Sequence, residues 1–213
     1  MTEELIKAAK TEFDLTDLSH QKSVLQLAER FLDLFKKGDL EMLKNELRAD
    51  GVPIEARMAG LLASSKKWML ENREPKKVAV IFAMWGEQNR LLPKSRDNPN
   101  GEDSLVAKIE QLDWAAKGSN IDWHLYAVDD GCPHSSGSIA KRIASEHALG
   151  DKVSVLSLSD ALPADDGPLV GLASADDSRK AGAIILGAMN AINDGADVVI
   201  YTDADNSVHL GQI

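Results

Sequence analysis

The chain has 213 residues, of which 44% are hydrophobic, so it is long enough for one sizeable domain or for a domain with a helical appendage. Its formal net charge of −10 argues against a nucleic-acid-binding surface, because such a surface needs clustered lysine and arginine. The single cysteine, Cys132, cannot form an internal disulfide, and no apolar run approaches the roughly 18 residues of a membrane span. Residues 1–4 also lack the character of a secretory signal, so we expect a cytoplasmic protein without a transmembrane segment.

Residues 1–75 have the pattern of consecutive helices. The apolar residues between positions 24 and 35 recur at the spacing of one helix face. A short helix is expected over about residues 40–47, and a third helix follows Pro53, because proline suits the first turn of a helix. We expect this all-helical segment to be an appendage that packs on the rest of the chain or mediates assembly.

After Pro75 the pattern alternates between short apolar strands and helices. The expected strands span residues 78–83, 123–128, 153–156 and 197–202, and the expected helices span about residues 102–117, 138–147 and 177–194. Short, continuously apolar strands are typical of a parallel sheet covered on both faces. We therefore predict an α/β fold for residues 76–213, with a parallel sheet flanked by helices and preceded by the all-helical segment.

The long helix before the last expected strand has a regular apolar pattern. Five of its side chains share one helix face: Ala181, Ile184, Ile185, Ala188 and Ile192. The segment from 161 to 177 before this helix is rich in loop-forming residues and is a candidate mobile segment.

Two aspartates follow the last expected strand. Ligands of open α/β sheets bind beyond the carboxyl ends of the strands, which is where Asp203 and Asp205 lie. Two carboxylates one residue apart can bind Mg²⁺ or Mn²⁺, whose remaining ligands commonly include substrate phosphates. The same pair can instead close the strand as an Asx turn. The buried strand before them favours Asp203 and Asp205 as metal ligands.

Two other strand ends carry polar candidates. Asp129 and Asp130 follow the second strand, where an aspartate can accept hydrogen bonds from a nucleobase or ribose, although a turn at Gly131 would explain them equally. Trp85 and Glu87 follow the first strand, and the indole of Trp85 is a candidate for stacking on a base. Because parallel strand ends meet at one edge, these side chains could line one pocket.

Arg179 and Lys180 lie near the start of the long helix. Backbone N–H groups at a helix N-terminus attract phosphate, and a basic side chain adds a direct charge. The alternative is a solvated basic pair on a surface helix. Together with the carboxylates at the strand ends, the pair suggests a diphosphate site.

The order of these motifs carries a resemblance to a known family. Val128-Asp129-Asp130-Gly131 after one strand and Tyr201-Thr202-Asp203-Ala204-Asp205 after another resemble the family 2 type of GT-A glycosyltransferases, over roughly residues 77–213. The resemblance implies a sugar donor linked to a nucleotide diphosphate such as UDP or GDP, with Mg²⁺ or Mn²⁺. By resemblance, Asp129 and Asp130 contact the nucleoside, Arg179 and Lys180 the diphosphate, Asp203 the ribose and the metal, and Asp205 the metal.

The chain departs from the family pattern at four places, one of which is Asn206 after the acidic motif, where an apolar residue or glycine is frequent. The first strand ends in Ala83-Met84-Trp85-Gly86-Glu87, where many members have Pro-x-Tyr-Asn-Glu, although Glu87 matches the family glutamate. Residues 1–75 have no counterpart in the minimal fold. The family's acceptor half and general base lie downstream of the Asp-x-Asp motif, and only eight residues follow Asp205 here. We therefore expect an incomplete GT-A unit with weak or no transferase activity.

Three functions compete at this point. The leading hypothesis is a metal-dependent glycosyltransferase, or its donor-binding part, that transfers a sugar to an acceptor hydroxyl. A sugar-phosphate nucleotidyltransferase is the first alternative, because residues 89–94 resemble its Arg-Leu-x-Pro loop, although only Gly86 supplies the glycine that such a loop needs. A non-catalytic interaction module on a transferase-like scaffold is the second. A homo-oligomer is expected through the N-terminal helices or through exposed sheet surface.

Overall fold

The structure is a computed structural model that describes residues 2–35 and 40–212. Four helices come first in the chain: α1 (Thr2–Ala8), α2 (Leu18–Phe35), α3 (Leu40–Arg48) and α4 (Ile54–Glu71). Strands and helices then alternate: β1 (Lys76–Met84), α5 (Gln88–Leu91), α6 (Ser104–Ala116), β2 (Ile121–Asp129), α7 (Ser136–Glu146), β3 (Val153–Ser157), α8 (Lys180–Asn193) and β4 (Val198–Thr202). The predicted helices and strands are therefore present, and α1 and α5 are additions that the sequence pattern did not indicate.

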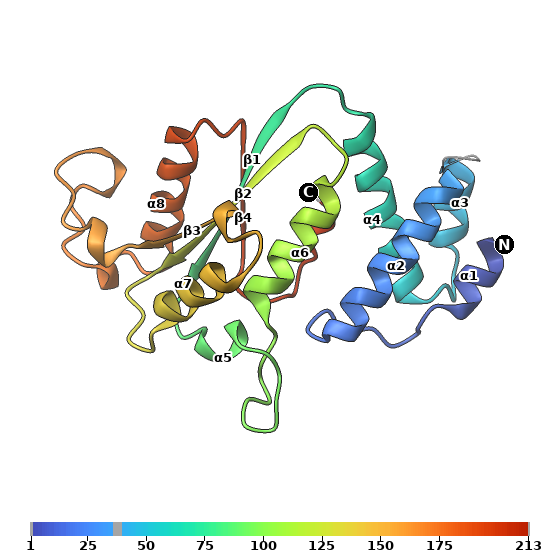
Figure 1. Cartoon of the computed structure of the whole chain (residues 1–213), viewed down its shortest axis with the longest axis horizontal. Helices are drawn as coiled ribbons and strands as arrows, with labels where there is room; N and C mark the ends of the chain where they lie inside the picture. Colours follow the sequence, from blue (N-terminus) through green and yellow to red (C-terminus); the bar gives the residue numbers. More distant parts are fainter. Residues whose placement is uncertain (1, 36–39, 213) are drawn as a thin grey trace.

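The four strands form one all-parallel sheet in the order β3-β2-β1-β4 (Figure 1). Helices α6 and α7 cover one face of the sheet, and α8 covers the other. The predicted α/β fold with a parallel sheet flanked by helices is confirmed. Since all strands run in the same direction, their carboxyl ends meet at one edge, on the side of α5 in Figure 1.

The side chains of β1 show why its sequence is continuously apolar. Val80 and Phe82 pack with α6, whereas Ala79 and Ile81 pack with α8, and all four are buried. A strand covered on both faces has no solvent-facing row, so alternation of polar and apolar residues is absent. The central strand thus holds the two halves of the core together.

Helix α8 packs most closely on the sheet through residues outside the apolar stripe noted in the sequence, although Ile185 and Ala188 of that stripe are partly buried in the same core. Its buried residues are small or flexible: Gly182, Ala183, Leu186, Gly187 and Ala191. Ile192 is largely exposed instead. A Cβ atom added at Gly187 would lie 2.6 Å from Ile81 Cγ2, so glycine lets the helix approach the sheet closely. The close approach of the α8 backbone to β1 therefore decides which residues of the helix are buried, and the spacing of its large apolar residues does not.

The N-terminal helices have a core of their own and also contact α6. Phe31 and Leu62 are among the buried residues between α2 and α4. Lys66 on α4 lies 4.3 Å from the ring centroid of Trp114 on α6, and the buried amide of Gln21 accepts a hydrogen bond from Gln111 on α6 at 3.0 Å. The all-helical segment therefore packs against the helical layer of the sheet.

The sheet is open at β4. Val198, Val199 and Tyr201 on this edge strand are exposed, as is the neighbouring Ile192.

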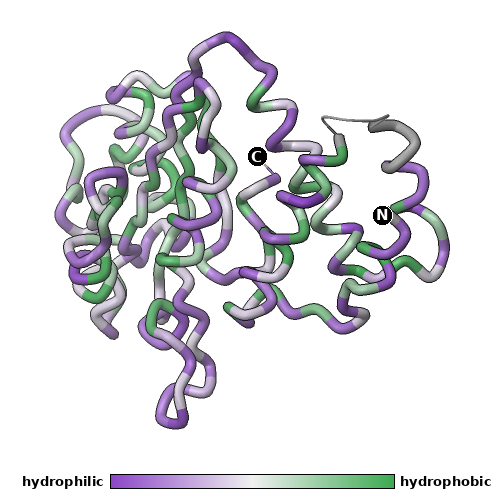
Figure 2. The backbone as a smooth tube through the Cα atoms, turned by 45° about the vertical axis from the view of Figure 1, so that its right-hand side comes forward, coloured by the Kyte–Doolittle hydropathy of each residue, from purple (hydrophilic) through white to green (hydrophobic). Residues whose placement is uncertain are grey.

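No helix in residues 2–35 and 40–212 combines the length and the apolar character that crossing a membrane requires. Figure 2 shows a hydrophilic loop that projects from the carboxyl edge of the sheet, between α5 and α6.

Candidate functional site

The carboxyl ends of β1, β2 and β4 meet at one pocket. The parallel register places Met84 opposite Asp129 and Phe82 opposite Thr202, so the residues after each strand emerge side by side. The pocket has a volume of about 220 Å³. Six of the predicted site residues line it: Trp85, Glu87, Asp130, Lys180, Asp203 and Asp205. We call it the strand-end pocket.

Asp203 is held by two neighbours at the mouth of the strand-end pocket. The ammonium of Lys180 pairs with Asp203 Oδ1, and the hydroxyl of Tyr201 donates to the same oxygen at 2.7 Å. The hydrogen bond from Lys180 holds the pKa of the Asp203 carboxyl below its usual value, and the same bond raises the pKa of Lys180. Both groups are therefore charged at neutral pH, and both side chains remain about half exposed, at 54% and 55%.

Asp205 is ordered by the residues that follow it. Its Oδ1 accepts hydrogen bonds from the Ser207 hydroxyl at 2.6 Å and from the Ser207 backbone N–H at 3.1 Å. The hydroxyl bond is the main reason why the pKa of Asp205 is lowered. The Asx turn considered for the Asp-x-Asp motif does occur here, on a carboxylate that also lines the pocket.

A buried lysine lies beneath the acidic motif. Lys108, in the middle of α6, has no exposed surface, and its Nζ donates to the backbone carbonyl of Asp205 at 2.6 Å. Burial lowers its pKa to about 8, although attraction to Asp205, Glu102 and Asp203 opposes this shift. Sequence reasoning did not single out Lys108. A usable signal existed, since it lies within the apolar stripe of Leu105, Ile109 and Leu112.

Arg90 forms a second cationic contact beside the pocket. Its Nη1 lies 2.8 Å from Glu87 Oε2, and its Nε lies 3.2 Å from Glu102 Oε1. Glu102 also accepts a hydrogen bond from the backbone N–H of Asn206 at 3.0 Å. The triad Glu87–Arg90–Glu102 thus links the loop after β1 to the segment after Asp205.

Asp130 is buried in the strand-end pocket without a partner for one oxygen. Its Oδ1 accepts no hydrogen bond from any described residue, and the side chain is almost fully buried. Burial, assisted by repulsion from Asp129 and Asp176, raises the pKa of Asp130 to about 6. A buried acceptor that lacks a donor is costly, so the position suits a ligand that supplies an N–H or O–H group.

Asp129 is placed differently from Asp130. Its Oδ1 accepts from the backbone N–H of Cys132 at 2.7 Å, and its Oδ2 accepts from that of Gly137 at 2.9 Å, at the start of α7. A Cβ atom at Gly137 would lie 2.3 Å from Asp129 Oδ2, so the glycine makes room for the carboxylate. Asp129 orders the loop after β2 and does not line the strand-end pocket.

Of the predicted basic pair, only Lys180 lines the strand-end pocket, just as only Asp130 does among Asp129 and Asp130. Lys180 begins α8 and enters the strand-end pocket. Arg179 precedes the helix with φ of 51°, is exposed, and does not line the pocket. Within the described chain its guanidinium makes no hydrogen bond or ion pair, so the structure brings only Lys180 to the carboxylates.

The loops after β1 and β2 are joined around Cys132. Its sulfur accepts from the backbone N–H of Gly86 at 3.2 Å, and Ser136 accepts from the backbone N–H of Glu87 at 3.0 Å. Burial raises the pKa of the Cys132 thiol, but hydrogen bonds from Ser136 and from backbone N–H groups outweigh it and leave the pKa below the usual value. The indole of Trp85 is exposed and packs edge-on against His134, with centroids 6.2 Å apart.

Asp203 and Asp205 are the side chains that would hold a divalent cation, whose remaining ligands would be phosphate oxygens and water. Nowhere in residues 2–35 and 40–212 are three His, Cys, Asp or Glu side chains grouped so as to hold a metal ion. Mg²⁺ is commonly bound by one or two carboxylates with the rest of its shell from phosphate and water, which matches Asp203 and Asp205. His209 is buried, and its Nδ1 accepts from the Gly211 backbone N–H at 2.9 Å.

Comparison of the chain with protein-family models, with curated proteins and with solved structures gives no match.

Proposed function

We propose that the chain binds a nucleotide diphosphate sugar together with Mg²⁺ or Mn²⁺, as the donor-binding part of a metal-dependent glycosyltransferase. The observation that carries the proposal is the convergence of Asp203, Asp205, Lys180 and Asp130 on one pocket at the carboxyl edge of a parallel sheet. Ligand binding at this edge is the general rule for such sheets. The pocket combines acidic, basic and buried acceptor groups, which a nucleotide diphosphate requires at different points.

Each lining residue has a role that its surroundings support. Asp203 and Asp205 are ionised and would hold the cation, which supplies charge neutralisation of the diphosphate leaving group. Lys180 would exchange its pairing with Asp203 for a phosphate oxygen, because both side chains are solvent-accessible. The free Oδ1 of Asp130 would accept a hydrogen bond from the base or ribose. Trp85 offers an exposed aromatic face beside these groups.

The glycosyltransferase is preferred over the nucleotidyltransferase because of Arg90. In the loop of residues 89–94 this arginine is already paired with Glu87 and Glu102. A nucleotidyltransferase needs closely approaching glycine backbone at the triphosphate, and among the described residues no glycine lines the strand-end pocket.

Metal-dependent nucleotide binding tests the proposal directly. Thermal stability would be measured with UDP and GDP, each with and without Mn²⁺, on the wild type and on Asp205→Asn, with Asp165→Asn in an exposed loop as the matched control. We expect at least one nucleotide to stabilise the wild type and the control in a Mn²⁺-dependent, concentration-dependent way, and Asp205→Asn to lose this effect. Absence of any Mn²⁺-dependent shift in the wild type would contradict the proposal.

Self-association through the open edge of the sheet is proposed as well. The exposed apolar side chains of Val198, Val199 and Tyr201 support it, since an uncovered edge strand with apolar side chains favours pairing with another strand. Light scattering on wild type and Val199→Lys, over a range of concentrations, tests it. A wild type that stays monomeric at every concentration argues against this interface.

A further inference from the structure

A second pocket lies beside the strand-end pocket and shares a wall with it. It has a volume of about 530 Å³ and lies between the loop after β1, the loop before α6 and the segment that joins α1 to α2. Arg90 lines both pockets. We call this second cavity the loop pocket.

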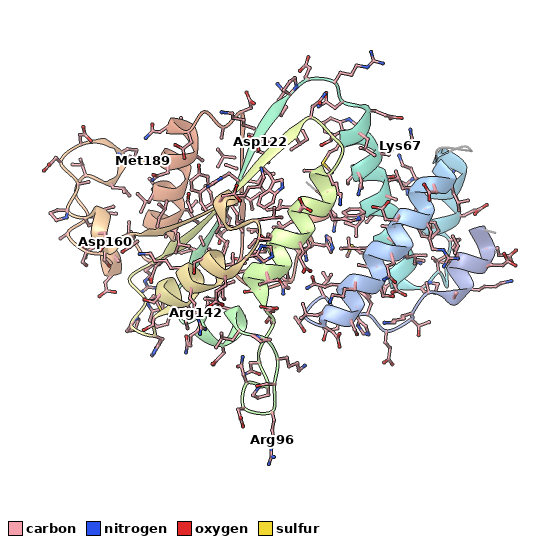
Figure 3. All side chains as sticks on the ribbon, viewed as in Figure 1. Lys67, Arg96, Asp122, Arg142, Asp160 and Met189 are labelled. Atoms are coloured by element: carbon pink, nitrogen blue, oxygen red, sulfur yellow. The ribbon has the colours of Figure 1, made fainter. Side chains whose placement is uncertain are left out.

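The loop of residues 93–101 that forms one side of the loop pocket is internally braced. The Asn98 side-chain amide donates to the carbonyl of Asn89 at 2.8 Å and to that of Pro93 at 3.2 Å. A Cβ atom at Gly101 would lie 2.4 Å from the Pro93 carbonyl, so the loop closes only because glycine stands there. Figure 3 shows Arg96 at the outer tip of this loop, away from the sheet. The loop of residues 93–101 is therefore an internally hydrogen-bonded wall of the loop pocket.

The lining of the loop pocket is polar, with no large apolar side chain. The groups that matter are the amides of Asn89 and Asn100, the hydroxyl of Thr16, and the charges of Arg90, Lys94 and Glu102. An amide offers both donors and an acceptor, and this combination matches a hydroxyl group, which also donates and accepts. The lining thus favours a molecule rich in hydroxyl groups over an apolar ligand.

The charge of the loop pocket adds a second requirement. Arg90 is offset by Glu87 and Glu102, to which it is paired. The Lys94 ammonium is exposed and makes no hydrogen bond or ion pair in the described chain, apart from a longer-range attraction to Asp14. One cation is therefore left for a ligand, and it can bind a carboxylate or phosphate by a charge-assisted hydrogen bond.

We infer that the loop pocket binds the acceptor, and that the acceptor is a small polyol or sugar with one anionic group. This inference rests on the proposed function, because only a bound donor in the strand-end pocket makes the adjacent ligand an acceptor. In that reaction an acceptor hydroxyl oxygen forms a bond to the anomeric carbon of the donor. The bond between that carbon and the diphosphate oxygen breaks, and the hydroxyl proton passes to a phosphate oxygen of the departing diphosphate.

The N-terminal helical segment takes part in this site. Thr16 lies between α1 and α2, and its hydroxyl and backbone N–H both donate to Asp14 Oδ1 at 2.8 Å, which leaves the hydroxyl oxygen free to accept. The appendage thus contributes a side chain to the loop pocket as well as packing on α6.

Binding of defined probes to the full chain tests the inference. Calorimetric titration would use glycerol 3-phosphate and glucose 6-phosphate. The comparison probes are glycerol and glucose, which lack the anionic group, and inorganic phosphate, which lacks the polyol. We expect saturable binding of a polyol phosphate by the wild type. Lys94→Gln and Asn100→Ala, both in the exposed loop, should each weaken it, with Lys94→Gln weakening it about tenfold or more, as loss of a charged hydrogen bond implies. Lys117→Gln, an exposed lysine outside both pockets, should bind as the wild type does.

The outcomes separate this inference from the proposed function. A wild type that binds no polyol phosphate, or binds it equally in Lys94→Gln and Asn100→Ala, overturns the inference. Equal binding of inorganic phosphate also overturns it, because the hydroxyl-rich lining would then contribute nothing. The Mn²⁺–nucleotide titration is run on the same variants, and Lys94→Gln should retain it. Binding of a polyol phosphate without any nucleotide binding supports the loop pocket and contradicts the transferase.

Discussion

The Nζ of Lys108 donates a hydrogen bond to the backbone carbonyl of Asp205 at 2.6 Å, so a buried ammonium supports the loop that carries the acidic motif. Lysine is rarely buried without a carboxylate partner, because transfer of a charge out of water is costly. Here several carboxylates lie close enough to offset part of that cost. The arrangement joins the core of α6 to the chemistry of the strand-end pocket.

Lys108→Met should change how stability depends on pH. The folded-state pKa of Lys108 is about 8, below the value of 10.5 in the unfolded chain. Between these values the unfolded state binds more protons, so this lysine makes the wild type more stable as the pH rises from about 8. Urea unfolding from pH 7 to 10 should show this rise in the wild type and a flatter curve in Lys108→Met. Parallel curves would contradict it.

Asp130→Asn should stabilise the protein at neutral pH and weaken nucleotide binding. The folded-state pKa of Asp130 is about 6, above its ordinary value of 3.8, so the folded state binds more protons between these values. The wild type therefore loses stability as the pH rises from about 4 to 6, and the amide variant should not. Urea unfolding over this range measures the slope. Asp165→Asn is the control, and it should keep the slope of the wild type.

Lys180→Ala should weaken nucleotide binding while changing the stability of the fold only slightly. Its ion pair with Asp203 is about half exposed, and such pairs contribute at most about 1 kcal/mol to folding. We expect a small change in the unfolding midpoint but a clear loss of affinity for the Mn²⁺–nucleotide complex, because a direct phosphate contact is removed. Calorimetry on Lys180→Ala and on the exposed neighbour Arg179→Ala makes the comparison. Equal losses would show that both cations reach the phosphate.

Gly187→Ala should destabilise the fold by about 1–3 kcal/mol, because the added methyl group would overlap Ile81 and push α8 away from β1. Ala181→Val on the exposed side of the same helix is the control, and it should cost less. Chemical denaturation of both variants measures the difference. A neutral effect at Gly187 would mean that the helix can shift without loss of packing.

Gln111→Leu should loosen the contact between the N-terminal helices and the segment after the acidic motif. The Gln111 amide donates to Gln21 Oε1 at 3.0 Å and accepts from the Leu210 backbone N–H at 2.8 Å, and both bonds are buried. Removing it leaves buried partners unsatisfied, at a cost of about 1–3 kcal/mol. The double variant with Gln21→Leu should cost less than the two single changes together, because the shared bond is lost only once. Additive costs would contradict the coupling.

Much of the fold followed from local pattern. The apolar runs that became β1 and β2 predicted parallel strands because a doubly covered strand has no polar row. Because the carboxyl ends of parallel strands meet at one edge, the positions of Asp130, Asp203 and Asp205 after their strands predicted that they lie at the same edge. The apolar stripe of α8 did not show how the helix packs, since spacing alone does not reveal that Gly187 allows a closer approach to the sheet than isoleucine does.

The sequence by itself determined the succession of strands and helices along the chain in residues 76–213. It also determined that acids follow three of the strands, because both features depend on hydrophobic period and chain position. Only the tertiary structure decided which of those acids lines the pocket. Asp129 is taken up by the N–H groups of Cys132 and Gly137, whereas Asp130, its neighbour in sequence, is left with a free buried oxygen. Lys108 likewise reaches the carbonyl of Asp205 over a separation of 97 residues in the sequence. Such a partner is set by how α6 packs on the sheet, which the spacing of residues along the chain does not encode.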